Sequence, residues 1–277
     1  MLTLMQAVGA GCPNIKNDVL IVQGLLNQSV PRPTPPLGVD GSAGNRTFAV
    51  LTQFIEREMN FCPASGVKFE PGSAAWWRLV IPTELPRAAG GAKLVESDFE
   101  TAAKTLNCEV ACVKAVNEVE SGKYGGYFAS GRPVILFEAH IFSKYTGHKY
   151  DKVLPGISSR KWNRDLYRGG EQEYDRLEKA MAFDRKAALM AASWGRFQIM
   201  GFNYASAGYV SVDDFVTAMY LSEARHLEAF LSFLRAKHLD SKLRDKNWAS
   251  FAEGYNGDGY ADNQYDTKLE VAYKKFI

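Results

Sequence analysis

Glu120 is the carboxylic acid whose place in the sequence best suits acid catalysis. It closes the run from Cys108 to Glu120, whose valines recur at helical spacing, and the helix-ending pair Ser121-Gly122 follows it. At the end of an apolar helix, the negative pole of the helix dipole and burial both favour the neutral acid. Glycoside cleavage needs such an acid to protonate the departing sugar oxygen. Spacing alone also allows a helix-end carboxylate without a catalytic role.

A second carboxylate would serve as the base. Inverting glycosidases activate a water across the sugar ring, with the two carboxyl groups roughly 6.5–9.5 Å apart. Glu138 is the first choice, because it follows a predicted strand that could fold back toward the helix end. The alternative is that Glu138 only stabilises the N-terminus of a helix beginning near Ala139. Asp151, Asp165 and Asp258 are further candidates.

Three polar side chains have groups that can bind sugars. The Gln198 amide offers a donor and an acceptor, which suit an N-acetyl group or a hydroxyl. Tyr255 could hydrogen-bond near the leaving oxygen or near Glu120, and Asn256 could orient a sugar or a backbone turn. We expect Gln198 and Tyr255 to face a cleft.

Aromatic side chains are further candidates. Trp194 and Phe197 have flat apolar faces on which pyranose rings could stack, although core positions are the alternative for both. The pair Trp76-Trp77 lies in a segment rich in Gly, Pro and Ala, where it could stack on sugars or cover a seam between domains.

The sequence lacks the residue spacings that are typical of metal sites, redox sites and serine hydrolases. The histidines show no His-x-x-x-His pattern, the cysteines no Cys-x-x-Cys pair, and no Gly-x-Ser-x-Gly elbow is present. We therefore expect no metal and no cofactor, with the cysteines as small apolar side chains. The residues concerned are His140, His148, His226, His238, Cys12, Cys62, Cys108 and Cys112.

Charge and hydropathy limit the partners. Net charge is +2 and is spread evenly, with 8 Lys and Arg against 7 Asp and Glu in residues 1–96. A nucleic-acid binder concentrates its basic residues, so we expect no nucleic acid. No run approaches the ~18 apolar residues of a membrane span, and no heptad seam indicates an oligomer, so we expect a monomer without stable membrane insertion.

The chain divides by composition into three parts. Residues 1–62 hold two amphipathic stretches, Asp18–Asn27 and Asn45–Ile55, around a Gly/Asp turn, which predicts a small helical module. Residues 63–96 are rich in Gly, Pro and Ala and predict a linker. Residues 97–277 predict mainly helices.

Within that last part, Ser97-Asp-Phe-Glu100 has the form of a capping box that starts a helix. Tyr127 to Phe137 predicts a short β-hairpin turning at Ser130-Gly131, and a last helix begins near Asp266.

The first part resembles the peptidoglycan-binding domain of cell-wall hydrolases, a three-helix bundle. The resemblance lies in Leu37-Gly-Val-Asp-Gly41 with Gly44 and Thr47, preceded by Gln23. It implies a module that grips peptidoglycan. The proline-rich stretch at 30–36 is longer than usual in that family. The glycines and Asp40 individually need do no more than build a turn.

The third part resembles the soluble lytic transglycosylase and goose-type lysozyme superfamily. Three strings carry this in order: Glu120-Ser121, Gly195-Arg-Phe-Gln198 and Gly254-Tyr-Asn256. The match is closest to the N-acetylmuramidase domain of phage endolysins, through Gly131 to Phe142 and Ser193 to Met200.

The resemblance implies a lysozyme-like α+β domain with a short hairpin. Glu120 would be the general acid, while Ser121, Gln198, Tyr255 and Asn256 would line the saccharide cleft. Arg196 stands where the superfamily usually has leucine, and this could alter the cleft wall.

Three functions fit these expectations. The first is a muramidase that hydrolyses the β-1,4 bond between N-acetylmuramic acid and N-acetylglucosamine. The second is a lytic transglycosylase, which would leave 1,6-anhydromuramyl ends, and the third is a non-catalytic wall-binding virion protein. Because the N-terminus has no signal-peptide pattern, we expect a cytoplasmic protein of a phage-infected host that reaches the wall at lysis through a holin.

Overall fold

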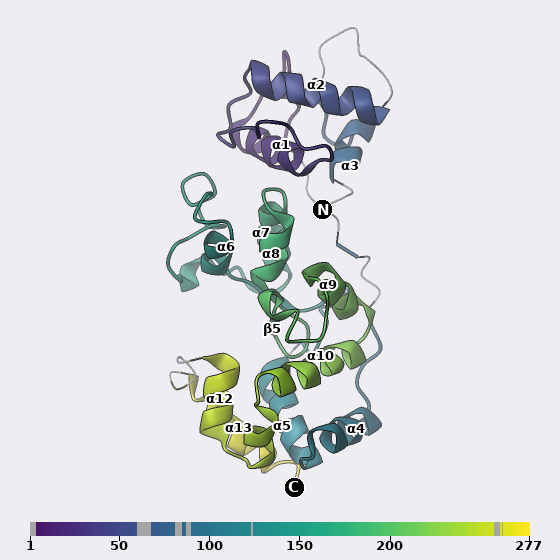
Figure 1. Ribbon diagram of the computed structural model, residues 1–277, viewed down its shortest axis with the longest axis vertical. Helices are drawn as coiled ribbons and strands as arrows, with labels where there is room; N and C mark the ends of the chain where they lie inside the picture. Colours follow the sequence, from purple (N-terminus) through teal and green to yellow (C-terminus); the bar gives the residue numbers. More distant parts are fainter. Residues whose placement is uncertain are drawn as a thin grey trace. The chain divides into compact units, whose positions relative to one another are not determined.

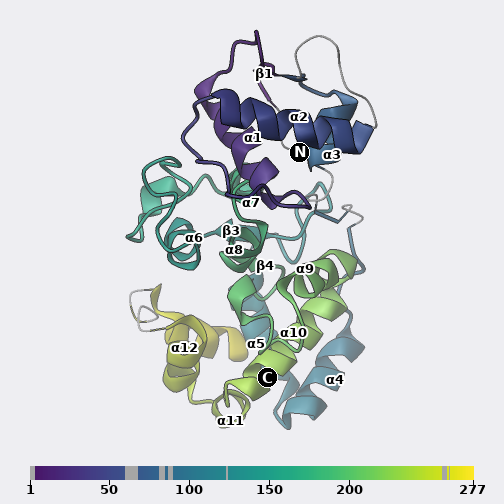
Figure 2. The same ribbon diagram turned by 45° about the horizontal axis from the view of Figure 1, so that its top comes forward.

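The computed structural model describes residues 4–59, 68–80, 85–86, 90–122, 124–257, 261 and 263–277. The chain forms two compact units. The first comprises residues 1–85, 137–168 and 172–188, and the second comprises residues 86–136, 169–171 and 189–277. Figures 1 and 2 show the ribbon from two directions. The structure is mainly helical with small sheets, as expected for a lysozyme-like fold.

The elements of the first unit are β1 (Val8–Gly9), α1 (Lys16–Gln28), α2 (Asn45–Met59), β2 (Lys68–Phe69), α3 (Ala74–Val80), α6 (Ala139–Tyr145) and α7 (Glu173–Met181). The second unit holds α4 (Glu96–Leu106), α5 (Val110–Ser121), β4 (Ala192–Trp194), β5 (Ile199–Met200), α9 (Val212–Leu221), α10 (Glu223–Ala236), α11 (Asp240–Arg244), α12 (Trp248–Asn256) and α13 (Tyr265–Tyr273). Both β3 (Ile135–Phe137) and α8 (Arg185–Met190) run across the boundary between the units.

The N-terminal helices form a small bundle, α1, α2 and α3, whose inner faces are apolar (Figure 1). Both predicted helices are confirmed, and α3 supplies the third. The linker expected at 63–96 is wrong for residues 68–80, because Phe69 and Trp76 are fully buried there and β2 pairs with β1. Trp76 packs edge-on against Phe69, with ring centroids 6.4 Å apart, so it is a core residue of this bundle.

Gln23 organises the turn between α1 and α2. Its Oε1 accepts hydrogen bonds from the backbone N–H groups of Asp40 (3.1 Å) and Gly41 (2.9 Å), and its Nε2 donates to Asp40 Oδ1 (3.0 Å). Gly41 has a φ of +77°, which favours glycine. These residues of the signature build the turn, as the simpler interpretation of them predicted.

The first unit also joins α1 to the turn between α7 and α8. Gln28 Nε2 donates to the carbonyl of Met181 at 2.9 Å, and Gln28 Oε1 accepts from the Arg185 N–H at 2.9 Å. One turn earlier, Gly24 passes so close that a Cβ would lie 2.4 Å from the Ala182 carbonyl oxygen. The N-terminal bundle is therefore in direct contact with a segment 150 residues further along the chain.

In the second unit, α5 is central and packs against α4 and α13. Its buried face consists of Ala111, Cys112, Val113, Ala115 and Val116. The capping box expected at Ser97 is displaced: α4 begins at Glu96, and the Asp98 carboxylate accepts a hydrogen bond from the N–H of Val95 at 2.8 Å.

The predicted hairpin exists as a short antiparallel bridge between Tyr127 and Pro133, and the chain continues into β3. β3, β4 and β5 form one sheet in that order. Among the helices of the described ranges, none is long and apolar enough to cross a bilayer.

Candidate active site

Glu120 lies in the last turn of α5, just before Gly122, whose φ of +49° ends the helix. Its side chain keeps part of its surface exposed. Loss of water around the carboxyl raises the pKa of Glu120 from 4.5 to about 8, while a hydrogen bond with the Asn256 side chain acts in the opposite direction. At pH 7 this carboxyl is therefore mostly protonated.

Two tyrosines of the neighbouring helices lie close to this carboxyl. Tyr255 comes from the end of α12 and Tyr265 from the start of α13. The charge of Glu120 raises the pKa of Tyr265 to about 12, and burial and the same carboxyl raise the pKa of Tyr255. The structure thus brings Tyr255 and Asn256 to Glu120, as expected, and adds Tyr265, which no sequence pattern indicated.

Tyr255 is held firmly in place. Its hydroxyl donates to the Phe197 carbonyl at 2.7 Å, and its ring stacks on Phe251 at 5.6 Å between centroids. Its proton is directed to that carbonyl, and a hydrogen bond from Tyr255 to the leaving oxygen stays a prediction. Tyr255 joins α12 to the strand turn that carries Gln198.

Gln198 makes its hydrogen bonds within the protein. Its Nε2 donates to the carbonyls of Gly195 (2.7 Å) and Val134 (3.2 Å), and its Oε1 accepts from Ser193 Oγ (2.7 Å). With a φ of +46°, Gln198 closes the tight turn between β4 and β5. Sugar binding by Gln198 stays a prediction. In the structure, the contacts of Gln198 hold the turn between β4 and β5 in place.

Trp194 and Phe197 are core residues, each about 1% exposed. Trp194 Nε1 donates to the Leu189 carbonyl at 3.1 Å, and Phe197 stacks on Phe230 at 4.4 Å between centroids. Neither ring presents a free face, so the expectation that they stack on sugars is wrong. Their alternative assignment as core is confirmed.

Arg196 belongs to a buried polar cluster that the sequence analysis missed. It pairs with Glu223 at 2.8 Å and hydrogen-bonds Asn117 of α5. Burial lowers the pKa of His226 to about 4, so its ring is neutral; it accepts from the Arg196 N–H at 3.1 Å and donates to the Met219 carbonyl at 2.7 Å. Arg196 therefore connects α5 to α10.

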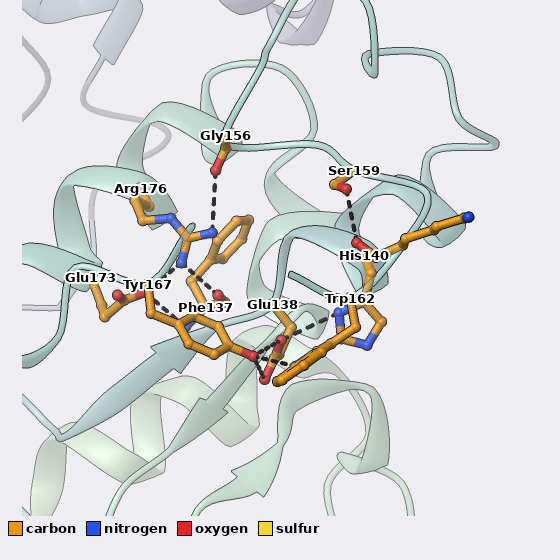
Figure 3. Close-up of polar contacts among 10 residues, drawn as sticks. Phe137, Glu138, His140, Gly156, Ser159, Trp162, Tyr167, Glu173 and Arg176 are labelled. Atoms are coloured by element: carbon orange, nitrogen blue, oxygen red, sulfur yellow. Dashed lines mark hydrogen bonds and ion pairs between the residues drawn. The ribbon is translucent and has the colours of Figure 1, made fainter. Parts of the chain in front are cut away.

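Glu138 lies in the first unit, directly after β3, at the N-cap position of α6, where its side chain makes no capping hydrogen bond. The Tyr167 hydroxyl is within hydrogen-bond distance of both carboxylate oxygens, at 2.9 and 2.7 Å, and His140 Nδ1 lies 3.3 Å from Oε2 (Figure 3). Burial raises the pKa of Glu138, whereas Tyr167, His140 and Arg176 oppose that shift.

A buried ion pair fixes the backbone before Glu138. Arg176 and Glu173 are fully buried and lie 2.7 Å apart. Arg176 also donates to the Phe137 carbonyl at 2.7 Å, and Glu173 accepts from the Phe137 N–H at 3.3 Å (Figure 3). Both backbone groups of the preceding residue are thereby held, which fixes the direction in which Glu138 leaves the strand.

The other candidates have different surroundings. Asp151 accepts hydrogen bonds from Ser143 (2.7 Å) and Ser158 (2.6 Å), and its pKa is lowered, so it is a structural anchor. Asp165 is exposed, Ser121 ends α5, and Asp258 lies outside the described residues. In the parts of the chain that the structure describes, no group of three or more His, Cys, Asp or Glu side chains is arranged to hold a metal.

Comparison with known proteins identifies the family. An N-acetylmuramidase family model matches residues 109–277, which include Glu120 and Glu138. The crystal structure of the Burkholderia AP3 phage endolysin is similar over 100% of this chain and 98% of its own, with 36% identity and a TM-score of 0.61. A search of curated proteins finds no match. The chain therefore belongs to the N-acetylmuramidase family and is a peptidoglycan-degrading glycoside hydrolase of the lysozyme type.

Proposed function

We propose that the chain is a phage endolysin that hydrolyses the β-1,4 bond between N-acetylmuramic acid and N-acetylglucosamine, with Glu120 as the general acid. The observation that supports this most is the carboxyl of Glu120 at the end of α5, whose pKa is raised to about 8 by loss of water. A protonated acid at neutral pH can give its proton to the bridging oxygen as the bond breaks.

Glu138 is proposed as the base that takes a proton from the attacking water. Its carboxylate is partly buried, accepts a hydrogen bond from Tyr167 and lies beside His140. Burial raises the pKa of Glu138, and the hydrogen bond from Tyr167 and the charges of His140 and Arg176 oppose that shift in favour of the ionised form, which a base requires. A change of Glu138→Gln would lower kcat about 100-fold or more, because the amide cannot take a proton from the attacking water. Unchanged kcat in that variant would remove Glu138 from the mechanism.

The variant Glu120→Gln tests the acid, because it removes the ionisable proton with little change in shape. Clearing of purified sacculi should fall about 100-fold or more, while circular dichroism stays that of the parent. Glu118→Gln is the matched control, since Glu118 lies in the same helix and pairs with Lys275. Unchanged clearing by Glu120→Gln would contradict the assignment.

The alternative reaction is lytic transglycosylation, in which the muramyl 6-hydroxyl attacks instead of water. A usable second carboxylate favours hydrolysis. Mass spectrometry of the released muropeptides separates the two reactions, because hydrolysis leaves reducing ends and transglycosylation leaves 1,6-anhydro ends. Anhydro ends as the main product would replace the hydrolase proposal.

The N-terminal bundle is proposed to bind peptidoglycan. Its turn carries the signature residues, held by Gln23, and its core is complete only with α3. A fragment of residues 1–85 should be helical by circular dichroism and should sediment with purified sacculi. A folded fragment that stays in the supernatant would withdraw the binding role.

The site of action is proposed to be the wall of a phage-infected host, reached when another protein opens the membrane. The similarity to a phage endolysin supports this. Cells that express the protein should stay intact until chloroform permeabilises the membrane and then lyse. Lysis before permeabilisation would contradict the requirement for a second protein. Light scattering in solution should give the mass of a monomer.

A further inference from the structure

Trp162 is an exposed aromatic side chain beside the proposed base. About 59% of it is accessible to solvent, so most of a large apolar ring system faces water. The side chain is nevertheless fixed: its Nε1 donates to the Tyr167 hydroxyl at 2.8 Å, and the two rings meet edge to face at 6.4 Å. These two contacts orient the indole while most of it stays exposed.

Tyr167 connects this indole to Glu138. Its hydroxyl oxygen accepts from Trp162 and its proton is directed to the Glu138 carboxylate, at 2.7 Å from the nearer oxygen (Figure 3). Its ring lies 5.9 Å from the guanidinium of Arg176, which the buried pair with Glu173 holds in place. The indole, the phenol and the carboxylate therefore form one chain of hydrogen bonds on a fixed support.

We propose that Trp162 is the platform of a sugar-binding subsite for a pyranose ring of the glycan strand, and that Tyr167 is the positioning residue that aligns Glu138 with it. This rests on the proposed function. The C–H face of a pyranose stacks on an indole, while the hydroxyl and N-acetyl groups at its rim find polar partners in Glu138 and His140, which lie 3.3 Å apart.

Binding to the inactive Glu120→Gln protein tests the platform without any turnover. The probe is a set of glycan strands from which an amidase has removed the stem peptides. Adding Trp162→Ala should weaken their binding about tenfold by calorimetry, whereas Trp162→Phe, which keeps a ring, should weaken it less. Circular dichroism controls for folding.

Equal binding by the Glu120→Gln protein with and without Trp162→Ala would overturn the platform. A loss seen only with strands that keep their stem peptides would also overturn it, because Trp162 would then contact peptide. The binding test of Trp162 does not depend on whether Glu138 is the base. If Trp162→Ala weakens binding while Glu138→Gln leaves kcat unchanged, Trp162 is still the platform. In that case only the proposal that Glu138 is the base is contradicted.

Tyr167→Phe tests the positioning role through the pH profile. The groups that face the Glu138 carboxylate are Tyr167, His140, Arg176 and Glu173. Tyr167 favours the ionised form of Glu138, so its removal should move the acidic limb of kcat/KM upward by about half a pH unit or more. The alkaline limb, set by Glu120, should stay in place. A uniform loss at all pH values, with neither limb moved, would reduce Tyr167 to a merely structural residue.

Discussion

At the scale of single residues, the carboxyl of Glu120 must keep its proton at neutral pH if it is to act as the acid. Glu120 sits where the C-terminal pole of α5 and loss of water both oppose its charge, and its side chain meets the amide of Asn256. Glu138 differs, because a phenol, an imidazole and a guanidinium all oppose the effect of burial. Two carboxyl groups with such different surroundings suit the two roles of acid and base.

The raised pKa of Glu120 makes a prediction about stability. Between pH 4.5 and about 8 the folded protein holds a proton that the unfolded chain releases, so the wild type loses stability as pH rises through this range. Glu120→Gln cannot titrate. The unfolding free energy of the variant minus that of wild type should therefore increase from pH 5 to pH 8, by up to about 1.4 kcal/mol for each unit of pKa shift.

Thermal melts at several pH values measure this difference. Glu100→Gln, an exposed carboxylate on α4, gives the effect of removing one surface charge. A difference in stability between Glu120→Gln and wild type that stays constant from pH 5 to pH 8 would contradict the raised pKa of Glu120.

The pH dependence of activity follows from the same value. A donor with a pKa of about 8 loses its proton above that pH, so kcat should fall on the alkaline side with a midpoint near 8. Initial rates on sacculi at constant ionic strength measure the curve. An alkaline limb that persists unchanged in the residual activity of Glu120→Gln would assign it to another group.

At the scale of elements, the sequence predicts helices better than it predicts contacts. The apolar periodicity correctly placed α2, α5 and α13, because each buries one face, and it also placed α1, which is buried on all sides from Asp18 to Leu26. It missed α3, since Pro and Gly around Trp76 suggested a linker while Phe69 and Trp76 supply the core that orders it.

The candidate site was predicted in part. Glu120 was predicted from its place at a helix end, and Tyr255 and Asn256 from the family resemblance; the structure brings the three together. Trp194 and Phe197 were misplaced, since an aromatic residue looks the same in a core and in a cleft until its neighbours are known. Trp162 and Tyr167 belong to a loop without periodicity, and only the tertiary structure joins them to Glu138.

The buried pair under β3 gives a prediction for this element. Arg176→Met leaves Glu173 buried without its partner, which should cost about 3–5 kcal/mol of unfolding free energy. Urea denaturation measures this. The double change Glu173→Gln with Arg176→Met should cost less than the single change. Equal losses of unfolding free energy in the single and the double variant would show that the unpaired charge of Glu173 is not the cause.

At the scale of the whole molecule, the N-terminal bundle and the turn between α7 and α8 form one compact unit. Gly24→Ala tests that contact. In the full chain the new methyl would meet the Ala182 carbonyl, so the melting temperature should fall. In the fragment of residues 1–85, where Ala182 is absent, alanine should instead stabilise α1 by up to about 1 kcal/mol. If Gly24→Ala stabilised both the full chain and the fragment, the contact between Gly24 and Ala182 would not form in solution.

The most direct test of the central claim is the titration of the Glu120 carboxyl itself. Carbon-13 NMR of the full chain labelled at the glutamate side-chain carboxyl, with Glu120→Gln to assign the resonance, follows its protonation with pH. The account predicts a midpoint near pH 8. A midpoint near 4.5, the ordinary value for glutamate, would contradict it.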